Sequence, residues 1–194
     1  MLANRLGTTK RLIAANRETA GAAKQSADTA KQALTSTQRA FVFINSFEVN
    51  VIGKEVRIIP KWENSGVTLG NPMKHINWKA FRGAPPSDYG YPDLDSSGAA
   101  LPSRGEAVEF FIGPKAIMLG TPVRIPISVM EEMRSGNLRI FVWGWAEYKD
   151  IFENTILHTT KFCSEIEITD LGREGDKTTV AAFFTTYGPY NSAN

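Results

Sequence analysis

Residues 39–52 read RAFVFINSFEVNVI, and this stretch marks the place where the pattern of the chain changes. Large apolar and aromatic side chains recur there at short, alternating intervals, which is typical of a β-strand. The preceding residues 17–38, RETAGAAKQSADTAKQALTSTQ, are rich in helix-forming Ala, Lys and Gln and contain almost nothing large enough to bury. The change predicts a helical arm over residues 1–39, followed directly by a β domain over residues 40–170.

Further strands are expected along the β domain, each an apolar run bounded by turn-forming residues. They are EVRIIPKWENSG (55–66), MKHINWKAFRG (73–83), EAVEFFIG (106–113), TPVRIPISV (121–129), LRIFVWGWAEYKD (138–150) and ILHTTKFCSEIEI (156–168). Pro60 indicates an edge or a bulge in its strand, and VMEEMRSG, ending at Gly136, predicts a short helical turn.

Seven strands separated by turns predict a mainly β fold, an immunoglobulin-like antiparallel β-sandwich with Greek-key links. The Cys–Trp–Cys signature of true immunoglobulin domains is absent, so this likeness concerns architecture alone. After Leu171 the chain becomes rich in Gly, Thr and Asn and ends in YGPYNSAN. Residues 171–194 are therefore expected to be an extended C-terminal tail that is ordered where something holds it.

The charge of the chain is unevenly distributed. The net charge of the 194 residues is +2, but residues 1–39 hold seven Lys and Arg against two Asp and Glu, whereas residues 40–194 hold fifteen against eighteen. Cys163 is the single cysteine, which excludes an intramolecular disulfide and fits a reducing compartment such as the cytoplasm. No apolar run approaches the ~20 residues of a membrane span, and no signal-peptide core follows Met1, so we expect neither a membrane-spanning nor a secreted chain.

The helical arm follows a seven-residue repeat of the kind found in coiled coils. Its a positions are Ile13, Ala20, Ala27, Leu34 and Phe41, its d positions are Asn16, Ala23, Ala30 and Thr37, and its e positions are Lys10, Arg17, Lys24 and Lys31. Small a and d residues let another helix approach closely but bury little area, so self-association through them is expected to be weak. No acidic g row faces the basic e row.

Two interpretations of this arm stay open. It is a solvated linker that lies on its own domain or on a second copy, or a docking helix whose basic row, with Arg17, Lys24 and Lys31, faces an acidic protein partner or anionic lipid headgroups. The sequence disfavours nucleic acid as a partner, because no aromatic or Asn/Gln base-reading set accompanies the basic row and the rest of the chain is acidic.

Aromatic side chains provide the other candidate contacts. Trp143 and Trp145 are predicted to share one face of their strand, either inside the sandwich core or as an exposed row used for binding. The long loop over residues 83–105 carries Tyr89 and Tyr91 and several prolines, and loops of this length are often functional. We therefore include Tyr89 and Tyr91 among the candidate interaction residues.

Residues with catalytic or metal-binding chemistry form no convincing site. His158 and Cys163 are five positions apart on one predicted strand, so they point to opposite faces; a buried Cys163 in the sandwich core and an exposed His158 are expected. The segment DLDSSG (93–98) resembles the opening of a calcium loop, but Arg104 occupies the place of its final glutamate. Glu109, Glu147 and Asp150 are a generic set of carboxylates. We expect no catalytic residues, no metal site and no cofactor.

A resemblance accompanies these motifs. The order of segments resembles a group of uncharacterised bacterial proteins in which an Ala/Lys/Gln-rich helix ending in a QRA-aromatic step precedes an immunoglobulin-like β domain. The matching motifs lie between about residues 15 and 170: QRAF (38–41), WENSG (62–66), WGWAEYKD (143–150) and HTTKFC (158–163). Many members carry a transmembrane helix just before the basic helix, and this chain does not. The group has no established activity, so the resemblance implies no functional residues.

These observations favour a non-catalytic accessory or scaffolding protein that docks onto a larger complex, or onto its own copies, through its helix, long loop and tail. If an anchor preceded the helix, its Lys and Arg residues would place the domain at the cytoplasmic face of a membrane. The competing class is a β-sandwich that binds a small ligand, a carbohydrate or a metal, or that acts as an enzyme.

Overall fold

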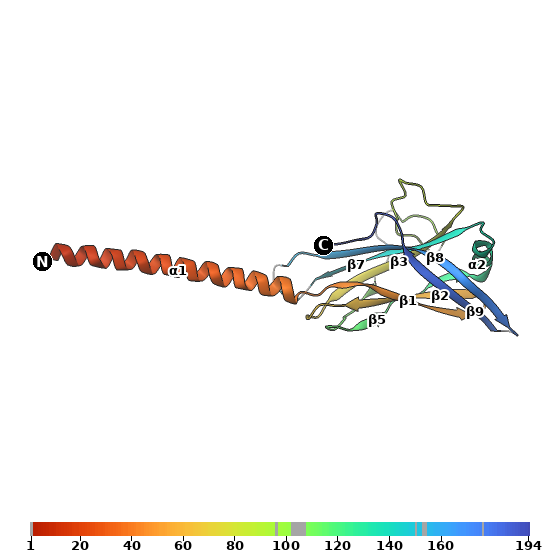
Figure 1. The fold of residues 1–194 in the computed structure, drawn as a ribbon, viewed down its shortest axis with the longest axis horizontal. Helices are drawn as coiled ribbons and strands as arrows, with labels where there is room; N and C mark the ends of the chain where they lie inside the picture. The colour runs from red at the N-terminus through yellow and green to blue at the C-terminus, as the bar shows by residue number, and fades with distance from the viewer. Residues whose placement is uncertain (1, 96, 102–107, 150, 153–154, 176) are drawn as a thin grey trace. The chain divides into compact units, whose positions relative to one another are not determined.

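A computed structural model describes residues 2–95, 97–101, 108–149, 151–152, 155–175 and 177–194. The chain divides into two compact units, Met1–Arg39 and Ala40–Asn194. The first is one long helix, and the second contains two antiparallel sheets, so the fold is mainly β with an N-terminal helix (Figure 1).

Helix α1 spans Leu2–Gln38, as the abundance of Ala, Lys and Gln predicts. Its hydroxyl side chains bond back to the helix: Thr19, Thr29 and Thr37, for example, each donate to the carbonyl oxygen four residues earlier at 2.9 Å. The side chains of residues 11–34 are exposed, including Leu12 and Ile13. This unit therefore owes its form to helix propensity and not to a core of its own.

The first sheet contains β1 (Val42–Ile52), β2 (Glu55–Asn64), β5 (Ile117–Leu119) and β6 (Val123–Pro126). β1 and β2 form an antiparallel hairpin, and β5 and β6 pair with the two halves of β2. Pro60 was expected to mark an edge or a bulge, but β2 is an inner strand, between β1 on one side and β5 and β6 on the other. Pro60 lies opposite the gap between β5 and β6, where its carbonyl oxygen accepts a hydrogen bond from Gly120 N at 2.7 Å.

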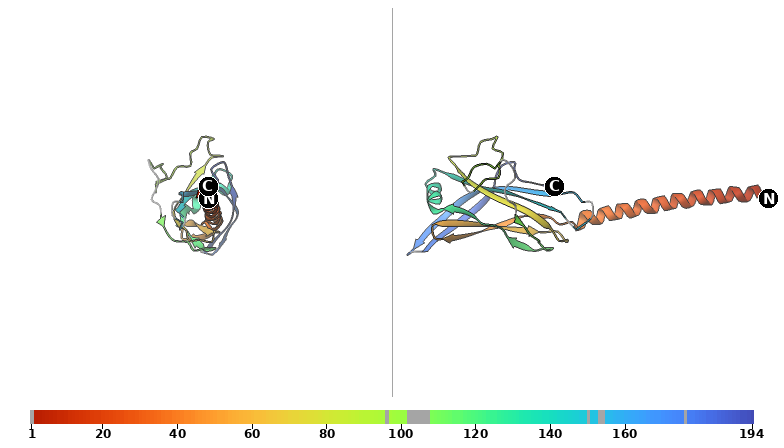
Figure 2. Two further views of the ribbon diagram at one scale, coloured as in Figure 1. Left: turned by 90° about the vertical axis from the view of Figure 1, so that its left-hand side faces the viewer. Right: turned by 180° about the vertical axis from the view of Figure 1, so that it is seen from behind.

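The second sheet has the order β10–β8–β7–β3–β4, with β9 also paired to β8. Its strands are β3 (Asn71–Phe81), β4 (Val108–Glu109), β7 (Arg139–Lys149), β8 (His158–Glu174), β9 (Lys177–Thr186) and β10 (Ser192–Ala193). The expected short helix is α2 (Ile127–Arg134), followed by Gly136 at φ 80°. α2 lies beside the β1–β2 turn, where Ile127 N donates to Lys54 O at 3.0 Å (Figure 2).

The C-terminal segment differs from the extended tail expected over residues 171–194. β8 continues to Glu174, and the chain returns through Gly175 at φ 60° as β9, antiparallel to β8. The physical reason is that every second residue in the middle of β9 is apolar and lies on one face: Val180, Ala182 and Phe184 pack against the main core. The Phe184 ring, for instance, stacks on Phe47 of β1 with centroids 4.3 Å apart.

Most of the hydrophobic core lies between the two sheets. Its largest buried members include Trp62, Ile58, Ile125, Ile140 and Tyr148. The Phe162 ring of β8 meets Trp62 of β2 edge to face, with centroids 5.8 Å apart. This contact joins the sheets because β2 and β8 belong to different layers.

Gly144 makes room for Phe162. The two residues face each other across β7 and β8, and a Cβ atom at position 144 would lie 2.8 Å from the Phe162 ring and would overlap the His75 carbonyl oxygen. Packing therefore requires glycine at position 144 of β7. Without a side chain there, the Phe162 ring can lie over β7 and reach Trp62.

The buried side-chain amide of Asn64 connects several segments at the start of the β unit. Its oxygen accepts hydrogen bonds from Phe41 N at 3.1 Å and Gly66 N at 3.0 Å. Its nitrogen donates to Thr68 O at 2.7 Å and to Ile112 O at 3.3 Å. One amide thus fixes the entry to β1, the turn after β2 and the segment preceding β5.

Replacing Asn64 with Ala should lower the free energy of unfolding by about 3 kcal/mol, because buried backbone donors and acceptors lose their partner. Asn45→Ala is the matched control: Asn45 is exposed and donates to Glu63 at 2.6 Å, so a change within about 0.5 kcal/mol is expected. Urea unfolding measures both. Equal effects of the two substitutions would contradict the assigned role of Asn64.

Gly144→Ala should destabilise the fold by about 3 kcal/mol or more, since the added methyl group has to displace backbone or the Phe162 ring. Gly113→Ala serves as control, because the added Cβ would lie 3.8 Å from the Cβ of Ala116, which is an ordinary van der Waals distance. Thermal unfolding compares the two, and an unchanged melting temperature for Gly144→Ala would refute the packing argument.

Candidate functional site

The outer face of the second sheet carries a buried aromatic layer. Trp143 and Trp145 share this face of β7, as predicted, together with Phe141; Phe141 and Trp143 are fully buried. The sandwich core was one expected location, but the row instead lies beneath the long loop, because the alternate residues Ile140 and Val142 face the other sheet. The aromatic row is therefore buried between the second sheet and the long loop, and not in the core between the two sheets.

Asp93 holds the long loop on this layer. Its buried carboxylate accepts hydrogen bonds from Trp145 Nε1 at 3.1 and 3.2 Å and from Asn77 Nδ2 at 3.0 Å. Leu94 N in turn donates to Asn77 Oδ1 at 2.8 Å, and Trp143 Nε1 donates to the Pro92 carbonyl at 3.0 Å. These bonds give Asp93 a structural role at the first position of the calcium-like segment.

The rest of that segment forms a turn. Asp95 accepts hydrogen bonds from the backbone N–H groups of Ser97 at 2.8 Å and Ala99 at 3.1 Å, and from the Ser97 hydroxyl at 2.7 Å. The Ser97 side chain in particular lowers the pKa of Asp95. Ser96 and Arg104 lie outside the described residues, as does Asp150 of the carboxylate set. Among the residues that are described, no group of three His, Cys, Asp or Glu side chains could hold a metal ion.

His158 and Cys163 lie on opposite faces of β8, as their spacing predicts: Cys163 belongs to the outer aromatic layer, whereas His158 faces inward beside Tyr148. The prediction of an exposed His158 is wrong, because His158 is 3% exposed and its Nδ1 lies 3.2 Å from Asn194 O. Cys163 is buried as expected, although under the loop, and burial raises the pKa of its thiol from 9.0 to about 12. This thiol is poorly suited to act as a nucleophile.

Lys74 is a buried lysine that the sequence interpretation did not single out. It is 6% exposed, and its Nζ lies 3.9 Å from the centre of the Phe110 ring and 3.5 Å from Leu119 O. Burial lowers the pKa of Lys74 to about 8. The available signal was its position in MKHINWKAF, where Lys74 shares the inward-facing register of Ile76 and Trp78.

A groove brings the predicted tyrosines of the long loop together with the C-terminal segment. This tyrosine–proline groove has a volume of about 550 Å³ and is lined mainly by Pro86, Tyr89, Tyr91, Tyr187, Pro189 and Tyr190. The Tyr91 ring lies 5.2 Å from Tyr89 and 5.0 Å from Tyr190, measured between centroids. Sequence reasoning missed Tyr187 and Tyr190, although the YGPY motif at 187–190 offered a signal.

Two features set the tyrosines of the groove apart. Tyr91 has φ 49°, an uncommon left-handed conformation for an aromatic residue, and burial raises its pKa to about 12. The Tyr89 hydroxyl is shielded from solvent and has no hydrogen-bond partner among the described residues. Residues in strained conformations cluster at binding and catalytic sites, so these features make the groove a candidate contact surface.

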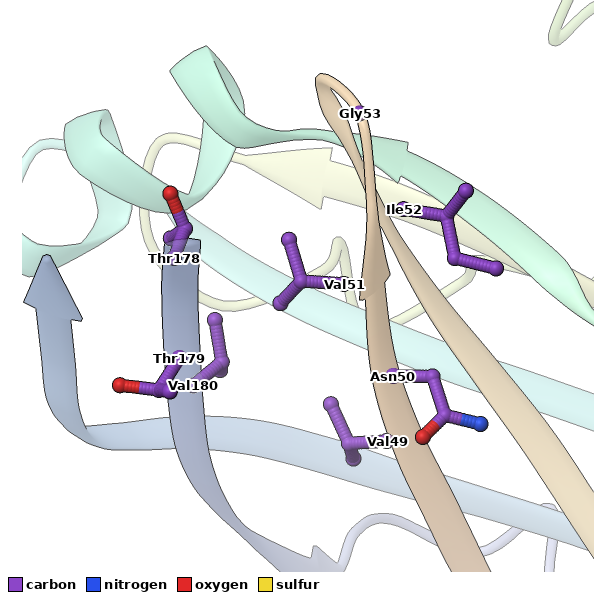
Figure 3. Close-up of a pocket in the computed structure, with 8 residues that line it drawn as sticks. All are labelled: Val49, Asn50, Val51, Ile52, Gly53, Thr178, Thr179 and Val180. Atoms are coloured by element: carbon purple, nitrogen blue, oxygen red, sulfur yellow. The ribbon is translucent and has the colours of Figure 1, made fainter. Parts of the chain in front are cut away.

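Described residues also line hollows elsewhere on the β unit. One, of about 800 Å³, lies between β1 and β9, where Val49, Val51 and Val180 line the opening beside Thr178 (Figure 3). Among the described residues that line it, none has an ionisable side chain. Another, of about 680 Å³, lies along β3 and α2 and is lined by residues that include Trp78, Lys79, Asp95, Arg124 and Glu132.

The predicted basic residues Arg17, Lys24 and Lys31 lie exposed on α1, in a separate unit from Tyr89 and Tyr91. Within the described residues, no helix is both long and apolar enough to cross a bilayer. No family model, curated protein or solved structure matches the chain.

The buried Cys163 thiol should react with a thiol-specific disulfide reagent at pH 8 at least roughly a thousandfold more slowly in the folded chain than in denaturant, because the thiolate is the reactive form. Stability should also fall as the pH rises from about 9, where the unfolded thiol ionises, toward about 12, where the folded one does.

Cys163→Ala should show a shallower decline over the same alkaline range. The difference between the two proteins isolates the thiol from other groups that titrate there. Comparable labelling rates in folded and unfolded chains would show that the loop does not cover Cys163.

Proposed function

We propose that this chain is a non-catalytic accessory or scaffolding protein that docks onto a larger complex, or onto its own copies, through α1. The observation that carries the proposal is the exposed helix: Leu12, Ile13 and Leu34 are 58%, 48% and 50% exposed. Most helices in proteins are stabilised by packing of an apolar face. A 37-residue helix whose a positions include Ile13 and Leu34 offers such a face to a partner.

The basic row supports an acidic partner surface. Arg17, Lys24 and Lys31 recur every seven residues on one side of α1, and all three are exposed. Long cationic side chains in such a row steer association with an acidic protein or with anionic lipid headgroups. The resemblance to proteins with an anchored helix adds a cytoplasmic location, at the inner face of a membrane, to the proposal.

The immunoglobulin-like type of the β unit is also part of this proposal. In such sandwiches the first, second, fourth and fifth strands share a sheet, and the third, sixth and seventh share the other. Here β1 and β2 share a sheet with β5 and β6, whereas β3, β7 and β8 are neighbours in the other sheet, which also contains β4, β9 and β10. The adjacency of β3, β7 and β8 supports the Greek-key type.

A ligand-binding sandwich is the second candidate, favoured by the hollow beside Trp78. That hollow has positively and negatively charged side chains around an aromatic face, which suits a small polar ligand or a carbohydrate. The charged residues are Lys79, Arg124, Asp95 and Glu132. Native mass spectrometry and elemental analysis of the purified chain separate the two classes: a stoichiometric small molecule or metal would favour the second.

Native capture with size measurement tests the docking function. Replacing the basic row (Arg17→Gln, Lys24→Gln and Lys31→Gln together) should weaken partner binding roughly tenfold, about 1.4 kcal/mol, and deletion of residues 17–37 should abolish it.

The matched control changes the net charge equally but on the opposite side of the helix: Ala22→Glu, Thr29→Glu and Ser36→Glu together. This variant should bind within about twofold of the parent chain. Undiminished binding by the deletion variant would overturn the proposal.

A further inference from the structure

We propose that the tyrosine–proline groove binds a proline-rich segment of a partner protein, in the polyproline II conformation and flanked by acidic residues. The inference rests on the proposed docking function and names a second contact surface, on the β unit, with the chemistry of its ligand.

The walls of the groove suit such a segment. Polyproline II has three residues per turn and no internal hydrogen bonds, and it binds aromatic-lined grooves because it loses little conformational entropy on binding. The ring of Tyr91 meets that of Tyr89 at 79° and that of Tyr190 at 33°. Tilted flat rings with Pro86 and Pro189 beside them form the ridged apolar surface on which proline rings pack.

The groove is held in shape from below. The Tyr89 ring packs edge to face on Phe81 at 5.1 Å and on Trp143 at 5.7 Å, and Tyr91 packs on Trp143 at 5.8 Å. These supporting rings lie on the strands of the second sheet. Their fixed positions preorganise the loop side of the groove, which reduces the entropy cost of binding.

The C-terminal side is fixed by Asn191. Its side-chain oxygen accepts a hydrogen bond from Cys163 N at 2.9 Å, and its nitrogen donates to Tyr187 O at 2.9 Å and Gly188 O at 3.1 Å. The segment that carries Tyr187 and Tyr190 is thereby tied to β8. Both sides of the groove thus stand on the same sheet.

The polar chemistry also matches. Proline residues have no backbone N–H, so a proline-rich segment presents carbonyl oxygens that only accept hydrogen bonds. Tyrosine hydroxyls can donate to such carbonyls, and Tyr187 and Tyr190 line the groove beside Tyr89, whose own hydroxyl is buried.

Cations surround the groove. Lys79 Nζ lies 5.9 Å from the centre of the Tyr89 ring, Lys161 Nζ lies 5.5 Å from that of Tyr190, and the Arg139 guanidinium lies 5.6 Å from that of Tyr187. Arg139 is engaged by Glu165 at 2.5 Å, so among the described cations at these rings Lys79 and Lys161 are the ones open to a ligand. Their sign selects acidic residues at the ends of the proline-rich core.

In the test, the full chain is titrated with a synthetic peptide of eight prolines flanked by two glutamates at each end. Binding is measured by calorimetry and by tryptophan fluorescence. Saturable one-to-one binding is expected, weakened at least tenfold by Tyr190→Ala. Phe183→Ala is the matched control, because Phe183 is an exposed aromatic (62%) on β9 outside the groove; it should leave binding unchanged.

Two further comparisons sharpen the result. A peptide with glycine at alternate proline positions should bind at least tenfold more weakly, and Lys79→Gln with Lys161→Gln should abolish the preference for glutamate over glutamine flanks. Tyr190→Leu, which keeps an apolar side chain without the flat ring, should lose binding like Tyr190→Ala and guards against misfolding of the latter.

No saturable binding up to about 1 mM peptide would overturn the proposal. Equal binding of the glycine-interrupted peptide, equal weakening by Phe183→Ala, or full binding by Tyr190→Leu would do the same. The basic-row variant of α1 should bind the peptide normally. Failure of the groove therefore leaves the docking function of the helix intact, and failure of helix docking leaves the groove intact.

Discussion

The buried amide of Asn64 is the constraint on which the β unit depends. It binds the backbone at Phe41, where β1 is about to begin, and also Gly66, Thr68 and Ile112. A second cross-link lies nearby: the Thr160 hydroxyl of β8 donates to Val42 O of β1 at 2.7 Å and so joins the two sheets. The end of the unit that follows the helical arm is therefore fixed by specific polar bonds, and the middle by aromatic packing around Phe162.

The second constraint is the aromatic layer on the outer face of the second sheet. Trp143 and Trp145 bind the long loop through Pro92 and Asp93, and the same layer supports the tyrosines of the groove. Two side chains with reactive groups are thereby engaged in the structure: the Asp93 carboxylate accepts hydrogen bonds from Asn77 and Trp145, and Cys163 is buried as a neutral thiol.

Sequence patterns predicted the arm, the strands now labelled β1, β2, β3, β7 and β8, and the short helix α2, because each has a clear local period. They did not predict β9, since its Thr-rich sequence becomes a strand only when β8 serves as its template. Alternation correctly placed Trp143 and Trp145 on one face, but it contains no information about the loop that covers them. The groove was half predicted: Tyr89 and Tyr91 stood out by composition, whereas Tyr187 and Tyr190 join them only through tertiary pairing.

Amide hydrogen exchange of the full chain tests the central claim most directly, recorded once for the dilute chain and once for the assembled complex. If α1 is a contact surface awaiting a partner, its amides over residues 11–38 should exchange rapidly in the dilute chain and become protected in the complex, at least roughly a hundredfold. The amides of Phe41 and Gly66, held by Asn64, should be slow in both states. An arm that exchanges equally in both states, with new protection confined to the β-strands, would contradict the account.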